Sequence, residues 1–74
     1  MDTANLVRMA NRIGDFFEAM PERDEALEAI AQHSRKFWDP RMRRQLLAAL
    51  EGGEATGLQD IVRNALERHR GSVV

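Results

Sequence analysis

Paired carboxylates in the first half of the chain are the residues best suited to acid–base chemistry or metal binding. Asp15 with Glu18 and Glu25 with Glu28 are each three residues apart, which puts both carboxylates of a pair on one face of a helix. A catalytic carboxylate also needs burial or a charged neighbour to shift its pKa, and nothing in the sequence places these pairs in a cleft. We therefore interpret them as part of a solvated helix face.

Other catalytic and metal-binding patterns are missing from the sequence. The chain has no cysteine, which excludes disulfides, thiolate metal sites, iron–sulfur ligation through thiolates and a thiol nucleophile. His33 and His69 fall on different predicted segments, and neither has a second ligand at metal-binding spacing. Phosphate-binding loops, nucleophile motifs and dinucleotide fingerprints are also absent. The sequence thus predicts no catalytic, cofactor-binding or metal-binding residue.

A cluster of arginines next to the single tryptophan is the strongest candidate for a functional surface. Arg41, Arg43 and Arg44 closely follow Trp38, and positions 41 and 44 share one helical face. Tryptophan and arginine are among the residue types most enriched at interface hot spots, so the cluster predicts a docking surface for an acidic partner. An ordinary solvated face with local ion pairs is the competing interpretation.

Aromatic residues extend this candidate surface. Phe16 and Phe17 are adjacent and point about 100° apart on a helix, so one of them must lie near the edge of the core, within reach of a partner. Trp38 suits a small core and an interface equally well. The predicted interface residues are Phe16, Phe37, Trp38, Arg41, Arg43 and Arg44.

Helices should position these side chains. Apolar residues recur every three or four positions over residues 3–20, which predicts a first helix that ends before Pro21. Gly14 inside it costs about 1 kcal/mol relative to alanine, which favours the close approach of another helix there. A second helix should begin within residues 21–24 and bury a face that ends at Phe37. No alternating strand pattern occurs, so the sequence predicts an all-α fold, a small bundle of about four short helices.

Two further helices complete the predicted bundle. The third should cover residues 40–50 and end at Gly52, because glycine readily adopts the conformations that follow a helix. The fourth should start at Thr56, because Gln59 three residues later has the spacing of a capping box. The last residues, about 70–74, should fray.

Length and charge point to a partner. A chain of 74 residues forms a single domain, residues 1–74, and buries only about 60% of its unfolded surface, so its stability should be marginal. The net charge is −1, yet residues 32–50 carry five basic side chains and one acidic, a net charge of +4.

No apolar run approaches the roughly 20 residues of a membrane span, and no signal-peptide pattern opens the chain. We therefore expect a soluble protein that stays where it is made.

Two segments of the sequence resemble a specific family. One runs Leu-Val-Arg-Met-Ala-Asn-Arg-Ile-Gly-Asp-Phe-Phe over residues 6–17. The other runs Phe-Trp-Asp-Pro-Arg-Met-Arg-Arg over residues 37–44, preceded by Ile-Ala-Gln-His at residues 30–33. Together they resemble the delta subunit of soluble NAD-dependent formate dehydrogenases, and the resemblance covers residues 5–47.

The resemblance implies a place in a cytoplasmic, hetero-oligomeric complex that oxidises formate to carbon dioxide and reduces NAD. That complex would hold a molybdenum or tungsten pterin centre, iron–sulfur clusters and flavin, all on other subunits. This chain would be a non-catalytic accessory subunit that packs against the large catalytic subunit around Trp38 and stabilises the complex or aids cofactor insertion. Two alternatives stay open. One is a transient assembly chaperone; the other is a small helical nucleic-acid-binding protein, which the acidity of the chain disfavours.

Overall fold

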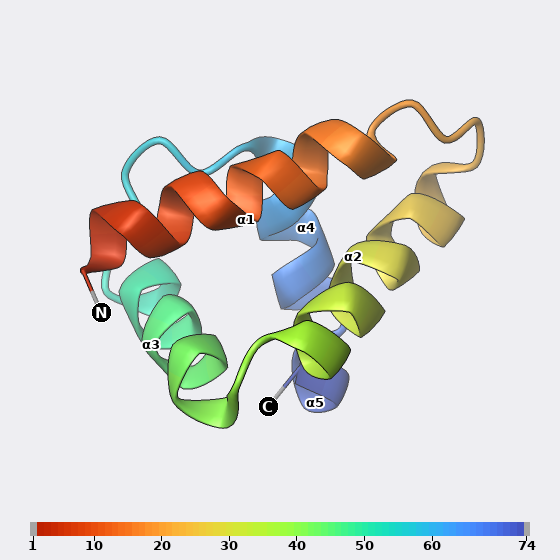
Figure 1. Ribbon diagram of the computed structural model, residues 1–74. Helices are drawn as coiled ribbons and strands as arrows, with labels where there is room; N and C mark the ends of the chain where they lie inside the picture. The colour runs from red at the N-terminus through yellow and green to blue at the C-terminus, as the bar shows by residue number, and fades with distance from the viewer. Residues whose placement is uncertain (1, 74) are drawn as a thin grey trace.

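The computed structural model describes residues 2–73, and helices account for the fold of this part of the chain. α1 spans Thr3–Phe17, α2 Arg23–Phe37, α3 Pro40–Glu51 and α4 Asp60–Arg68, and the four-residue α5 covers Arg70–Val73. Figure 1 shows α1 across the top of the bundle, with α3 below one end of it and α2 descending from the other. None of the described residues lies in a strand, so the predicted all-α bundle is confirmed.

Aliphatic side chains from every helix meet in one core. The largest fully buried side chains are Leu6, Ile30, Val62, Leu66 and Val73. Leu46 and Leu47 add the contribution of α3. None of the described helices combines the length and the apolar character that crossing a membrane would require.

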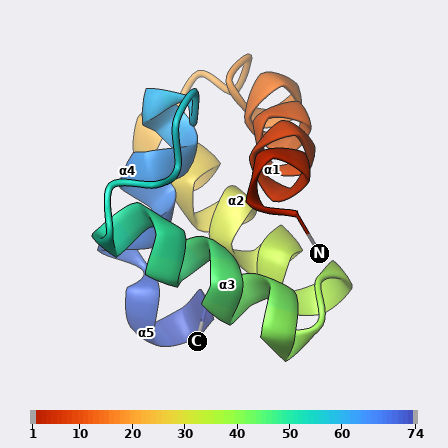
Figure 2. The same cartoon turned by 90° about the vertical axis from the view of Figure 1, so that its left-hand side faces the viewer.

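The C-terminal residues are better ordered than the sequence predicted. Residues 70–73 were expected to fray, but they form α5, and Val73 is only 1% exposed. Burial of this apolar side chain and an ion pair between Arg70 and Glu51 hold α5 against the bundle. Residue 74 lies outside the described part of the chain. Figure 2 shows α5 below α4, and α5 packs against α2 and α4.

The ends of α1 follow local signals, with one difference from the prediction. The side chain of Asp2 caps the helix, because its Oδ1 accepts a hydrogen bond from the Ala4 N–H at 3.0 Å. The helix ends at Phe17, three residues before the predicted end at Met20. A tighter turn follows, in which the Met20 N–H donates to the Phe17 carbonyl at 3.1 Å, since Pro21 disfavours helical geometry at the preceding residue.

The start of α4 was predicted wrongly, because α1 takes over the groups of the expected capping box. α4 begins at Asp60, not at Thr56. The Gln59 N–H donates to Asn11 Oδ1 at 2.9 Å, and Gln59 Nε2 donates to Asp15 Oδ1 at 2.7 Å. The backbone N–H of Gln59 is therefore bound to α1 and not to Thr56, and its side chain is held towards α1, with Oε1, the atom that would have accepted from the Thr56 N–H, left without a hydrogen-bond partner. Figures 1 and 2 show the α3–α4 loop passing from α3 along α1 to reach α4.

α1 and α4 approach each other closely at Gly14, as predicted. A Cβ atom at this position would lie 2.6 Å from Val62 Cγ2 and 2.8 Å from Gln59 Oε1. Both distances are too short for real atoms, so only glycine lets the two helices pack at this separation. The face of α1 that carries Gly14 is therefore fully used inside the chain.

Candidate docking surface

The three phenylalanines of the chain gather between α1 and α2. The Phe16 and Phe17 rings lie edge to face with their centroids 5.0 Å apart. The Phe17 ring is 6.1 Å from the imidazole of His33, which is 4.7 Å from the ring of Phe37. Two of these phenylalanines end α1 and the third ends α2, so the packing of these two helices creates the cluster.

Two of these rings face outwards. Phe16 is 76% exposed and Phe37 is 72% exposed, and they are the large apolar side chains left exposed among residues 2–73. One of the adjacent pair Phe16 and Phe17 thus lies beyond the core, as predicted. The prediction that Phe37 belongs to the buried face of the second helix is wrong, because α2 ends at this residue and Trp38 turns into the core in its place.

A hollow of about 460 Å³ lies beside the exposed rings, and we call it the aromatic groove. It is lined by Arg12, Ile13, Phe16, Phe17, His33 and Phe37. Four of these six side chains are apolar, and none is a carboxylate, a hydroxyl or an amide. Such a lining suits the binding of an apolar surface and offers no acid–base pair or nucleophile.

Trp38 lies in the core, which corrects its predicted place in the interface. The residue is only 6% exposed. The backbone is extended at Trp38, with φ −99° and ψ 139°, and again at Asp39 before Pro40. This extended corner between α2 and α3 directs the indole inwards. Of the two alternatives that the sequence left for Trp38, the core is the correct one.

Arg43 fastens α3 to the end of α2, a structural role that the sequence did not predict. Its Nη1 donates to the carbonyl oxygens of Arg35 at 2.8 Å and of Trp38 at 2.7 Å. These carbonyls lie at the end of α2, where the helix provides no partner for them. The guanidinium is half-buried, and its Nε is buried with no hydrogen-bond partner. Arg43 therefore holds the corner together.

The two remaining arginines of the cluster lie on the surface. Arg41 and Arg44 are both exposed, and their spacing puts them on the same outer face of α3. The single acidic residue of this segment, Asp39, caps α3 by accepting a hydrogen bond from the Met42 N–H at 3.0 Å. We therefore define the candidate docking surface as the exposed set Phe16, Phe37, Arg41 and Arg44.

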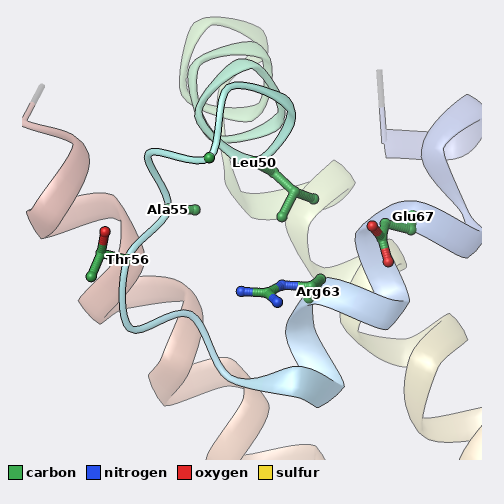
Figure 3. A pocket seen from close by; sticks show the side chains of 6 residues that line it. Leu50, Ala55, Thr56, Arg63 and Glu67 are labelled. Atoms are coloured by element: carbon green, nitrogen blue, oxygen red, sulfur yellow. The ribbon is translucent and has the colours of Figure 1, made fainter.

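A second hollow lies between the α3–α4 loop and α4, and its lining has an ordinary explanation. The side chain of Arg63 extends from α4 into this hollow towards the loop that carries Ala55 and Thr56 (Figure 3). Arg63 and Glu67 are both exposed charged side chains of α4, as is usual for the solvated face of a surface helix. Within residues 2–73, no three side chains of metal-binding type lie close enough to share an ion.

Sequence reasoning missed four residues of the aromatic groove: Arg12, Ile13, Phe17 and His33. A signal for two of them was present. Arg12 precedes Phe16 by four residues and His33 precedes Phe37 by four, so each lies on the same helical face as an exposed ring. The missing information was the packing angle of α1 on α2, which brings the two faces together.

The fold and this surface define a small helical protein whose exposed residues suit the binding of another protein. A family model for the NADH-dependent formate dehydrogenase delta subunit FdsD matches residues 5–66, which include nearly all of α1, all of α2 and α3 and most of α4. The chain belongs to this family. No curated protein and no solved structure matches it.

Proposed function

We propose that this chain is a non-catalytic accessory subunit of a cytoplasmic NAD-dependent formate dehydrogenase, the complex that oxidises formate to carbon dioxide and reduces NAD. The chain binds the large catalytic subunit through the docking surface and stabilises the hetero-oligomer or assists its assembly. Membership in the delta-subunit family supports a place in the complex. The observation that carries the docking role is the exposure of Phe16 and Phe37 at the edge of one groove.

The energetics of the two rings support this role. Burying one exposed phenylalanine side chain contributes about 1.5–3 kcal/mol. Two of them are a substantial fraction of the 5–15 kcal/mol that typically stabilises a folded protein, and small chains lie at the lower end of that range. A partner that covers Phe16 and Phe37 therefore offers this chain a large gain. Arg41 and Arg44 add attraction for an acidic surface and speed the encounter with it.

We place the redox cofactors of the complex on its other subunits. The expected groups are a molybdenum or tungsten pterin centre, iron–sulfur clusters, flavin and NAD. Iron–sulfur clusters are held mainly by cysteine thiolates, and this chain has no cysteine. Nor does it contain the glycine-rich fingerprint that binds dinucleotides.

Charge reversal on α3 tests the docking role. A tagged chain that carries Arg41→Glu and Arg44→Glu is expressed in the native cells, and the recovered material is assayed for formate-dependent NAD reduction. We expect this variant to lose the dehydrogenase, because two attractive contacts become repulsive. Arg43 stays unchanged, because its two hydrogen bonds stabilise the fold.

The matched control reverses two exposed arginines near α4, Arg23→Glu and Arg63→Glu, and changes the net charge by the same amount. It should recover as much active enzyme as the unaltered chain. Equal recovery by both variants would contradict the docking surface. Recovery of an active complex in equal stoichiometry indicates a resident subunit, whereas recovery of an inactive catalytic subunit without cofactors indicates a transient assembly role.

A further inference from the structure

The aromatic groove specifies its occupant more narrowly than the proposed function does. We infer that the groove binds an amphipathic helix that belongs to the large catalytic subunit. The apolar stripe of this helix covers Phe16 and Phe37, and carboxylates line one edge of the stripe. This inference rests on the proposed function and names the part of the partner that the surface holds.

The lining of the groove favours a helix over an extended segment. Arg12 and His33 are its only polar side chains, and Nδ1 of His33 is already buried inside the protein. An extended peptide would press unpaired backbone N–H and C=O groups against phenyl rings, at about 1–3 kcal/mol for each group left unsatisfied. α1 and α2 flank the groove, so no sheet edge is present to pair with such a peptide. A helix satisfies its own backbone groups and presents only side chains.

The row of rings sets the length of this helix. From Phe16 through Phe17 and His33 to Phe37, successive ring centroids lie 5.0, 6.1 and 4.7 Å apart. An α-helix rises about 5.4 Å per turn, so the row contacts no more than about three turns. The occupant therefore needs apolar anchors at the i, i+3 or i+4, and i+7 positions of one short helix.

The rim of the groove sets the charge of this helix. Arg12 is exposed and lines the groove. Lys36 is also exposed, and it follows His33 by three residues, so it lies on the same side of α2. Asp15 follows Arg12 by three residues and lines a neighbouring hollow with it, and its carboxylate already accepts a hydrogen bond from Gln59 Nε2 at 2.7 Å. Two lysine or arginine side chains at the rim select carboxylates along one edge of the bound helix.

A second copy of this chain fits the groove less well. A two-fold contact sets the same surface against itself, which brings the cations Arg12 and Lys36 towards those of the other copy.

Photo-crosslinking in the purified complex tests the inference. p-Benzoylphenylalanine replaces Phe16 or Phe37 in the tagged chain, which keeps an aromatic ring at an exposed position and leaves the core intact. In the control it replaces Glu54, which is exposed in the α3–α4 loop. We expect the first two positions to crosslink to one short segment of the catalytic subunit, with helical apolar spacing and carboxylates along one edge. A crosslinker at Glu54 should not reach that segment.

Charge reversal at the rim is a second test. Arg12→Glu should lower recovery of the complex several-fold at low salt and less at high salt, because salt screens the charges.

The outcomes separate the two proposals. Crosslinks from Phe16 and Phe37 to a segment of the catalytic subunit without this pattern overturn the helix inference and leave the proposed function standing. Recovery of the complex with no crosslink from these positions, or with crosslinks only to a second copy, overturns both the helix inference and the docking role of the two rings, while a place in the complex stands. Failure to recover any formate dehydrogenase subunit with the unaltered chain overturns the proposed function itself.

Discussion

The two segments that carry the family resemblance, residues 6–17 and 37–44, each divide into residues that face inwards and residues that face outwards. In the first segment, Asn11 and Gly14 face the α3–α4 loop and α4: Asn11 donates to the Gly57 carbonyl at 3.0 Å, and Gly14 leaves room for Val62. Two residues after Gly14, Phe16 is largely exposed. One side of α1 is therefore committed to the fold and the other is left open.

The second segment shows the same division at closer range. Trp38 is buried while Phe37 beside it is exposed, and Arg43 binds two carbonyls while Arg44 beside it is exposed. Neighbours of the same chemical type thus have opposite roles. Residue type therefore identifies both segments as candidate interaction regions. The direction in which each side chain points determines whether it stabilises the fold or is available to a partner.

The sharpest test of this division compares the two adjacent aromatics. Trp38→Ala should destabilise the chain by about 3–5 kcal/mol, because it removes a large buried side chain and leaves a cavity. Phe37→Ala should cost only about 0.5–1 kcal/mol, since it loses little beyond the ring contact with His33. Urea unfolding of both variants measures the difference. Equal losses would show that the inward and outward assignments are wrong.

A substitution at Gly14 tests the side of α1 that packs against α4. Alanine there should lower the free energy of unfolding by about 1–2 kcal/mol net, despite its better helix propensity, because Val62 is β-branched and turns away only with difficulty. The matched control is Gly71→Ala in α5, where an added Cβ meets no atom within 4 Å. It should be neutral or stabilise by up to about 1 kcal/mol. Thermal unfolding monitored by circular dichroism distinguishes the two, and a stabilising Gly14→Ala would contradict the tight packing of α1 on α4.

The arginine pair gives a smaller expected effect. Arg43→Ala should cost about 1 kcal/mol, because the Arg35 and Trp38 carbonyls lose their donor at a partly solvated corner. Arg44→Ala, at an exposed position, should change stability by less than about 0.5 kcal/mol. The same unfolding measurements apply. If both variants behaved alike, the corner would not depend on Arg43.

Local signals made much of the fold predictable from the sequence. Apolar spacing located the helices, and the Asp39–Pro40 pair marked the start of α3, where Asp39 does cap the helix. The start of α4 was missed because its decisive partner, Asn11, is 48 residues away in sequence from Gln59. No local pattern reports such a contact.

The candidate site was predictable in composition but not in geometry. The aromatic and basic residues were identified, yet Trp38 and Arg43 turned out to serve the fold. Their roles depend on the extended backbone at the α2–α3 corner, which rotates one aromatic inwards and leaves the preceding one outside. A helical projection of the sequence assumes a continuing helix and therefore fails at this point.

Co-purification of the catalytic subunit with the double variant Phe16→Ser and Phe37→Ser shows whether the outward aromatics bind the partner. Thermal unfolding of the same preparation shows whether the variant is still folded. Arg63→Ser on α4 serves as the control at an exposed position. We expect the double variant to lose the catalytic subunit while its unfolding free energy falls by no more than about 2 kcal/mol, because each exposed ring gives up one ring contact. Undiminished co-purification by a folded double variant would contradict the claim that the outward aromatics bind the partner.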